Sequence, residues 1–252
     1  MTPRELLDHE VLSQRYFFPR PDAPGEPERW LVDVAGARLV GAHVGHAGHP
    51  GLLFFHGNGE TACDWVSEVA DTGMEAFVAE YRGYGASTGH PALATMLDDA
   101  IALAHATNKA PGELVVYGRS VGSLYALHVA AHLDVRALVL ESGIADLGER
   151  LEARVKPEEL GVTRDELHAA LGALFDQRAK MQRTKCPVLV LHTENDSMVR
   201  VHHAHKFAEW AGDRAELVVF PLGDHNTIHA FNRPQIWDCV RNVAGRARRA
   251  PP

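Results

Sequence analysis

LVVYGRSVG, residues 114–122, is the stretch of sequence that decides the fold. Its first four residues form a short apolar run typical of a buried strand, and the residues after Gly122 continue with the apolar spacing of a helix. Ser120 therefore stands at the tip of a sharp strand-to-helix turn. The residues two positions to either side must be small so that strand and helix can approach, and Gly118 and Gly122 meet that need. Such a turn presents a serine hydroxyl at a helix N-terminus, where N–H groups favour developing negative charge.

Short apolar runs on both sides of this turn indicate a parallel sheet. They cover residues 52–55, 76–79, 114–117, 137–140, 188–191 and 217–220. Nearly continuous apolar runs are typical of strands buried on both faces, and segments of helical period lie between them. A hairpin over residues 29–44 precedes them and suits the edge of the sheet. We therefore expect an α/β fold, mostly parallel, with helices on both faces and a last helix from Pro234 to about Arg246.

Residues 144–185 are longer than one crossover between strands requires. Pro157 suits a first helical turn, and Thr163 with Glu166 predicts a capping box. We expect two short helices here, as an insertion within a single domain that spans residues 1–252. The insertion can belong to the core, or it can form a small cap over a ligand site at the carboxyl edge of the sheet.

A serine nucleophile needs a base, and the base needs a carboxylate to orient it. Among 16 histidines, His225 is favoured because it follows the strand at 217–220, at the sheet edge where Ser120 also lies. Asp196 follows the preceding strand in the same way. Glu194 and Asp224 compete for the orienting role, but Asp196 lies deeper in its loop. The chain order Ser, Asp, His is the one that this strand arrangement requires.

The segment His56-Gly57-Asn58-Gly59 follows the strand at 52–55 and predicts an oxyanion site. The backbone N–H of Asn58 can point at the oxygen that the N–H of Val121 would hold, and two such donors stabilise a tetrahedral intermediate. Alternatively, the glycines only permit a tight turn. With Glu80 after the next strand they also resemble a dinucleotide fingerprint. In that fold the glycine loop follows the first strand, whereas here a hairpin precedes it, so we reject that interpretation.

These residues resemble the α/β-hydrolase superfamily, and within it the small serine hydrolases of the BEM46-like and depalmitoylase-like group. The resemblance is carried by residues 56–59, the tyrosine- and glycine-rich loop at 81–91, the serine turn, and residues 192–199 and 223–226. It implies an eight-stranded sheet, an oxyanion hole built from Asn58 and Val121, and hydrolysis of an ester or thioester. The sequence lacks the N-terminal span and the N-terminal cysteine cluster of the membrane-associated members.

Composition excludes several classes of protein. The chain has 252 residues, 46% of them hydrophobic, and a formal net charge of −8, so no electrostatic feature favours nucleic acid as a partner. Three scattered cysteines do not make a disulfide framework. No apolar run approaches the ~18 residues of a membrane span, and no secretory signal is visible. We expect a cytoplasmic protein with no integral membrane segment, and the sequence leaves its oligomeric state open.

Two groups of histidines stand outside this scheme. His43, His46 and His49 recur at every third position, and His202, His203 and His205 precede a helix. Metal ligation needs converging ligands with supporting hydrogen bonds, which the sequence does not indicate. We interpret these histidines as solvated, and we expect no metal and no cofactor.

The hypothesis from sequence is therefore a serine hydrolase that acts on a small-molecule acyl ester or thioester. Ser120 is the expected nucleophile, His225 the base and Asp196 the orienting residue, with Asn58 and Val121 as oxyanion donors. Two alternatives remain: a catalytically silent binding module, and an amidase or peptidase on the same scaffold. The acyl group and the leaving group are not determined by the sequence.

Overall fold

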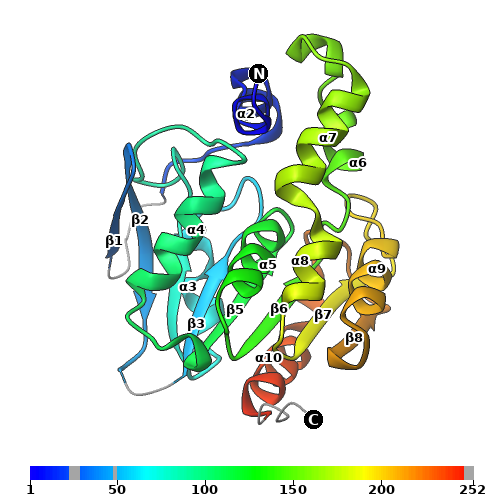
Figure 1. Cartoon of the computed structure of the whole chain (residues 1–252). Coiled ribbons are helices and arrows are strands. Elements are labelled where there is room, and N and C mark those ends of the chain that lie inside the picture. The colour runs from blue at the N-terminus through cyan, green and yellow to red at the C-terminus, as the bar shows by residue number, and fades with distance from the viewer. Residues whose placement is uncertain (23–28, 48–49, 247–252) are drawn as a thin grey trace.

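A computed structural model of the protein, which describes residues 1–22, 29–47 and 50–246, contains an eight-stranded sheet (Figure 1). Its strands lie in the order β1-β2-β4-β3-β5-β6-β7-β8. β2 runs antiparallel to both β1 and β4, and the other neighbouring pairs are parallel. The predicted α/β fold and its edge hairpin are confirmed. The strands are β1 Arg29–Val34, β2 Ala37–Val44, β3 Gly51–Phe55, β4 Glu75–Ala79, β5 Leu114–Arg119, β6 Ala137–Glu141, β7 Val188–Thr193 and β8 Ala215–Phe220.

The sheet is buried on both faces because alternate strand residues enter two different hydrophobic cores. In β3, Leu52 and Phe54 belong to one core, whereas Leu53 and Phe55 belong to the other. Side chains of a strand alternate between its faces, so a strand that is covered on both sides has apolar residues at successive positions. Each large side chain buried in this way contributes about 1.5–3 kcal/mol of transfer free energy.

Helices cover the two faces as expected (Figure 1). The core of Leu53 and Phe55 includes residues of α4 Thr95–Ala106, α5 Gly122–His132, α8 Gln177–Arg183 and α9 His202–Ala211, and also residues of the N-terminal segment and of the insertion after β6. The core of Leu52 and Phe54 is completed by α3 Ala62–Ala70 and α10 Ile228–Gly245. Two 3-10 turns, η1 Pro111–Glu113 and η3 Gly212–Arg214, lead into β5 and β8. None of the described helices is long and apolar enough to cross a membrane.

The insertion after β6 holds more helix than predicted. It contains α6 Leu147–Glu152, α7 Arg164–Phe175 and α8, together with a 3-10 turn, η2 Pro157–Leu160. The expectation of two short helices was wrong, and Pro157 opens only the 3-10 turn. The Thr163 and Glu166 capping box at the start of α7 is confirmed. The missed helices α6 and α8 are capped by Asp146 and Asp176, whose carboxylates accept hydrogen bonds from N–H groups three residues later. These caps were the only local signal, because neither helix contains a long apolar run.

The N-terminal residues fold over the edge of the sheet where β3 and β5 end, an arrangement that the sequence patterns did not predict. They form α1 Pro3–Leu7 and α2 Glu10–Tyr16, and α1 contacts α7 of the insertion (Figure 1). The capping box of Thr2 and Glu5 with Pro3 between them was the available signal. This arrangement brings the end of α2 to the place where the strands β3 and β5 end.

The last helix starts six residues earlier than predicted, at Ile228 instead of Pro234. The turn before it is closed by Asp224, whose carboxylate accepts hydrogen bonds from the N–H groups of Asn226 and Thr227. Ile228 is fully buried, so the first turns are held by packing. Proline inside a helix removes one backbone hydrogen bond, and tertiary packing here outweighs that cost.

Candidate active site

Ser120 occupies a strained turn between β5 and α5. Its φ is +52°, a left-handed backbone conformation that residues other than glycine rarely adopt. A Cβ on Gly118 would lie 2.5 Å from the carbonyl oxygen of Gly122, and one on Gly122 would lie 2.2 Å from that of Phe55. Both distances are below van der Waals contact, so only glycine permits this approach of strand and helix, as predicted.

The structure brings Ser120, His225 and Asp196 together, although they are distant in sequence. Nε2 of His225 lies 3.0 Å from Oγ of Ser120, and Nδ1 of His225 lies 2.7 Å from Oδ2 of Asp196. All three side chains are buried. A carboxylate can only accept hydrogen bonds, so Nδ1 of a neutral His225 carries the proton and Nε2 is free to accept one from the serine.

Asp196 is held in place by backbone donors. Its Oδ1 accepts hydrogen bonds from the N–H groups of Met198 at 2.9 Å and Val199 at 2.7 Å, while Oδ2 faces His225. Burial alone would raise the pKa of Asp196, but the hydrogen bond from His225 and these other interactions hold it below its usual value. The two other candidates for the orienting role are placed differently: Glu194 is exposed, and the carboxylate of Asp224 accepts hydrogen bonds within its own turn.

Asn58 and Val121 line the same cavity as Ser120. Within the described residues, neither backbone N–H donates a hydrogen bond to the protein. The side chain of Asn58 has a separate role that the sequence did not indicate. Its Oδ1 accepts hydrogen bonds from the N–H of Phe18 at 2.9 Å and the hydroxyl of Tyr84 at 2.7 Å, and its Nδ2 donates to the carbonyl of Tyr16. These bonds fasten the end of α2 over the loop that follows β3.

The cavity in front of Ser120 is small, about 80 Å³, and two segments far apart in sequence close it. Tyr16 and Phe18 come from the N-terminal region, whereas Ile144, Arg150 and Arg154 come from the insertion. The remaining lining residues are Asn58, Glu60, Arg119, Ser120, Val121, Met198, His225 and Asn226. The cavity therefore has an apolar wall and charged groups beside the serine.

Arg119, the residue before Ser120, ties the serine turn to the histidine loop. Its guanidinium donates a 2.7 Å hydrogen bond to the backbone carbonyl of His225. Its Nε lies 3.3 Å from carboxylate oxygens of Glu60 and of Glu141. Burial acts to lower the pKa of Arg119, but these two carboxylates raise it, so the side chain stays charged. The serine motif does not specify which residue occupies position 119, so only the fold identifies the partners of Arg119.

Glu141 and His229 extend this buried network. Nε2 of His229 lies 2.7 Å from Oε2 of Glu141, to which the hydroxyl of Tyr117 also donates. Burial acts to raise the pKa of Glu141, yet His229 and the other neighbours lower it to about 2. Burial acts to lower the pKa of His229, yet Glu141 and Glu68 raise it to about 9. The pair is therefore ionised at neutral pH, beneath the serine turn.

Glu80 is engaged inside the protein. One carboxylate oxygen lies 2.7 Å from Nε2 of His56, and the other accepts a hydrogen bond from the N–H of Ala62 at 2.9 Å. Burial acts to lower the pKa of His56, but the charge of Glu80 and their hydrogen bond raise it. Neither side chain is exposed, so Glu80 is unable to meet a ribose as the rejected dinucleotide interpretation would require.

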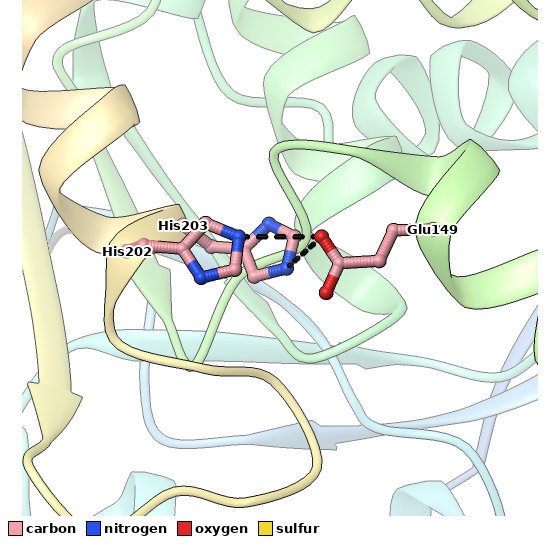
Figure 2. Close-up of side chains that lie close together, drawn as sticks. All are labelled: Glu149, His202 and His203. Carbon is pink, nitrogen blue, oxygen red and sulfur yellow. Dashed lines mark hydrogen bonds and ion pairs between the residues drawn. The ribbon is translucent and has the colours of Figure 1, made fainter.

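The second histidine group meets an acidic side chain. Figure 2 shows His202 and His203 of α9 side by side with Glu149 of α6, at 3.2 Å and 3.6 Å from its Oε2. His203 is fully buried, so its interpretation as solvated was wrong. Burial lowers its pKa to about 4. His49 of the first group lies outside the described residues.

The hydrogen bonds of His203 define its tautomer. Its Nδ1 accepts from the N–H groups of Ala145 at 3.2 Å and Asp146 at 3.3 Å, so the single proton of the neutral ring sits on Nε2, which points at Glu149. A nitrogen that carries a proton offers no lone pair to a cation. In this arrangement the cluster joins α6 to α9 and does not fit a metal.

Several known proteins are similar to this chain in sequence. A family model described as serine aminopeptidase, S33, matches residues 49–161. The protein YfhR of Escherichia coli K12 is 25% identical over 239 residues, which cover 86% of this chain and 81% of that protein. The lysophosphatidylserine lipase ABHD12 of Rattus norvegicus is 26% identical over 204 residues, which cover 73% of this chain but only 48% of that protein.

A solved structure has the same fold. The esterase Pf2001 of Pyrococcus furiosus superposes with a TM-score of 0.70 at 16% identity, covering 92% of this chain and 98% of that one. The sheet order, the strained serine turn and these likenesses together show that the chain belongs to the α/β-hydrolase superfamily.

Proposed function

We propose that the protein is a serine hydrolase that cleaves a carboxylic ester or thioester of a small molecule through an acyl-enzyme. The observation that carries the proposal is the continuous chain of hydrogen bonds from Ser120 through His225 to Asp196. This is the arrangement that turns a weakly nucleophilic hydroxyl into a strong nucleophile.

In the first half of the proposed reaction, Oγ of Ser120 attacks the carbonyl carbon while its proton passes to Nε2 of His225. The charge of Asp196, 2.7 Å from Nδ1, stabilises the imidazolium that forms. The tetrahedral intermediate then collapses, the bond to the alcohol or thiol breaks, and the leaving group takes the proton from Nε2. In the second half, water gives its proton to the same nitrogen and attacks the acyl carbon. The bond to Oγ of Ser120 then breaks, Oγ takes the proton back from Nε2, and the acid is released.

The N–H groups of Asn58 and Val121 are the proposed donors to the oxyanion. Both line the cavity beside Ser120, and neither is engaged by a described protein acceptor. Val121 also stands at the N-terminus of α5, whose dipole favours negative charge at that point. Loss of one such donor typically costs about 10²–10³ in turnover.

The proposal treats the chain as one domain in which residues 144–185 act as a cap. Ile144, Arg150 and Arg154 of this insertion line the cavity, which supports a role in substrate selection. The small volume of about 80 Å³ limits the closed form to a group of few atoms. A longer acyl chain would require the cap, or Tyr16 and Phe18 opposite it, to move.

Replacement of Ser120 by alanine tests the function. We expect Ser120→Ala to lose hydrolysis of p-nitrophenyl esters and to lose covalent labelling by a fluorophosphonate, with unchanged circular dichroism. Ser67→Ala, at an exposed serine of α3, is the matched control and should keep both properties. Labelling of Ser120→Ala at the wild-type rate would contradict the assignment of the nucleophile, and an unlabelled wild-type protein would favour a silent binding module.

Aminopeptidase activity is the second candidate, favoured by the description of the matching family model. That activity needs an anionic group to hold the substrate's terminal ammonium. Among the described residues that line this cavity, Glu60 is the only carboxylate, and it already accepts a hydrogen bond from the N–H of Gly57 and lies beside Arg119. The lining therefore disfavours a cationic substrate. A comparison of p-nitrophenyl esters, acyl thioesters and aminoacyl p-nitroanilides separates the two activities.

A further inference from the structure

Arg150 and Arg154 place two positive charges at the cavity that holds Ser120. They are four residues apart, at α6 and just beyond its end, and both line the cavity opposite the N-terminal segment. The chain as a whole carries a formal net charge of −8. In a protein of negative net charge, a local pair of positive charges creates a site that can attract an anion.

The acidic side chains near these arginines are engaged elsewhere. Glu152 pairs with Arg164 at 2.9 Å, Glu159 pairs with Arg15 at 2.6 Å, and Glu149 faces the two histidines of α9. Within the part of the chain that the structure describes, neither Arg150 nor Arg154 forms an ion pair.

Arg119 and Glu60, the other arginine and the one carboxylate among the described lining residues, compensate each other's charge. Glu60 lies 3.3 Å from Nε of Arg119 and also accepts a hydrogen bond from the indole N–H of Trp65. No acidic side chain of the described residues therefore pairs with the charges of Arg150 and Arg154 at this cavity. A cavity with low-dielectric walls strengthens the attraction of such charges for an anion.

Arg154 is also positioned by an aromatic ring. Its guanidinium carbon lies 5.1 Å from the centroid of Phe18, a cation–π contact across the cavity mouth. Tyr16, Phe18, Ile144 and Met198 supply the apolar part of the lining. The cavity thus combines an apolar wall with an arginine pair, and arginine binds carboxylate and phosphate oxygens through paired N–H donors.

We propose that Arg150 and Arg154 bind an anionic group, a carboxylate or a phosphate, carried by the substrate whose ester bond Ser120 attacks. This inference rests on the proposed function and adds the substrate class to it. The anion can belong to the acyl group, as in a half-ester of a dicarboxylic acid, or to the leaving group, as in an acyl glycerol phosphate. Both have the same chemistry at the arginine pair.

Two matched pairs of esters distinguish these sources. Mono-p-nitrophenyl adipate and its methyl ester differ only in a charge on the acyl side, and 1-hexanoyl-glycerol 3-phosphate and 1-hexanoyl-glycerol differ in a charge on the leaving-group side. We expect the wild-type protein to prefer the charged member of at least one pair in kcat/KM. The double variant Arg150→Met, Arg154→Met should lower that preference by about 10- to 100-fold, mainly through KM, as expected for loss of charge-assisted hydrogen bonds.

The double variant Arg178→Met, Arg183→Met is the matched control, because both are exposed arginines of α8 that do not line this cavity, and their loss removes the same two positive charges. It should leave the charged-to-neutral ratio unchanged. Arg150→Lys with Arg154→Lys should retain part of the preference. An equal ratio in the wild type and the double methionine variant, for both pairs, overturns the inference while leaving the serine hydrolase proposal intact.

A binding measurement keeps the inference testable if no ester is cleaved. Hexyl phosphate contains no carboxylic ester, and calorimetry can follow its binding to Ser120→Ala with and without the two methionine substitutions. Binding that is at least tenfold weaker in the arginine-deficient protein supports the inference independently of catalysis. Equal binding, or no binding by either protein, contradicts it.

Discussion

His229→Gln is expected to weaken the protein in a strongly pH-dependent way. His229 of α10 lies 2.7 Å from Glu141, a carboxylate with no exposed surface, and 3.4 Å from Glu68. Burial acts to lower the pKa of His229, but these carboxylates raise it from 6.5 to about 9. At about 1.4 kcal/mol per pH unit, the ionised histidine contributes about 3 kcal/mol to the free energy of unfolding.

The sign of the effect follows from the raised pKa. Below pH 6.5 both the folded and the unfolded chain hold the proton, so the stabilisation is fully present. Between pH 6.5 and 9 only the folded chain holds it, and the stabilisation is lost progressively as the pH rises. The free energy of unfolding of the wild type minus that of His229→Gln should therefore fall by about 3 kcal/mol between pH 6 and pH 9.5.

Urea unfolding followed by tryptophan fluorescence at pH 6, 7, 8 and 9.5 measures this difference. The difference between two proteins is needed because the pKa of Lys180, lowered by burial to about 7, gives the opposite slope over the same range. His205→Gln, at an exposed position of α9, reports the general effect of losing a histidine. A difference that is constant from pH 6 to 9.5 would refute the reasoning, because it would mean that folding does not stabilise the charged imidazole.

Three further changes have expected outcomes. Asp196→Asn should lower kcat for p-nitrophenyl esters by about 10⁴-fold with little loss of stability, because the imidazole loses its required tautomer; a drop below tenfold would contradict the orienting role. Gly122→Ala should destabilise the fold by about 3 kcal/mol in urea unfolding, because its Cβ would lie 2.2 Å from the carbonyl oxygen of Phe55. The control Gly172→Ala, at a position with open space around it, should not lower the free energy of unfolding. Lys180→Met should stabilise the protein by about 3 kcal/mol at pH 6 and by less at pH 9, because the buried ammonium has no hydrogen-bond partner among the described residues. An equal gain in the free energy of unfolding at pH 6 and pH 9 would contradict the lowered pKa of Lys180.

The sequence by itself determined the elements whose signals are local. The apolar runs predicted six strands because a strand that is buried on both faces has apolar residues at successive positions. Gly118 and Gly122 marked the serine turn because their Cβ atoms would overlap backbone oxygens. The positions of Asp196 and His225 after successive strands predicted that they lie at one sheet edge with Ser120, since parallel strands end on the same side.

Local signals were weaker where helices are short or depend on packing. The start of α10 was misplaced because proline is favoured in a first helical turn, while burial of Ile228 decides where this helix begins. The helices α6 and α8 were missed because their signal is a capping aspartate alone. These errors share one cause: tertiary contacts compensate for weak or unfavourable local propensity.

Only the tertiary structure decided which side chains surround the serine. Tyr16 and Phe18 reach the cavity because Asn58 holds the end of α2 there, and Arg119 contacts the carbonyl of His225 from a position that the motif leaves open. Arg150 is brought to the same cavity by the path of the insertion. Periodicity and motifs report the conformation of neighbouring residues, whereas contacts between distant segments depend on strand order and helix packing, which no single segment contains.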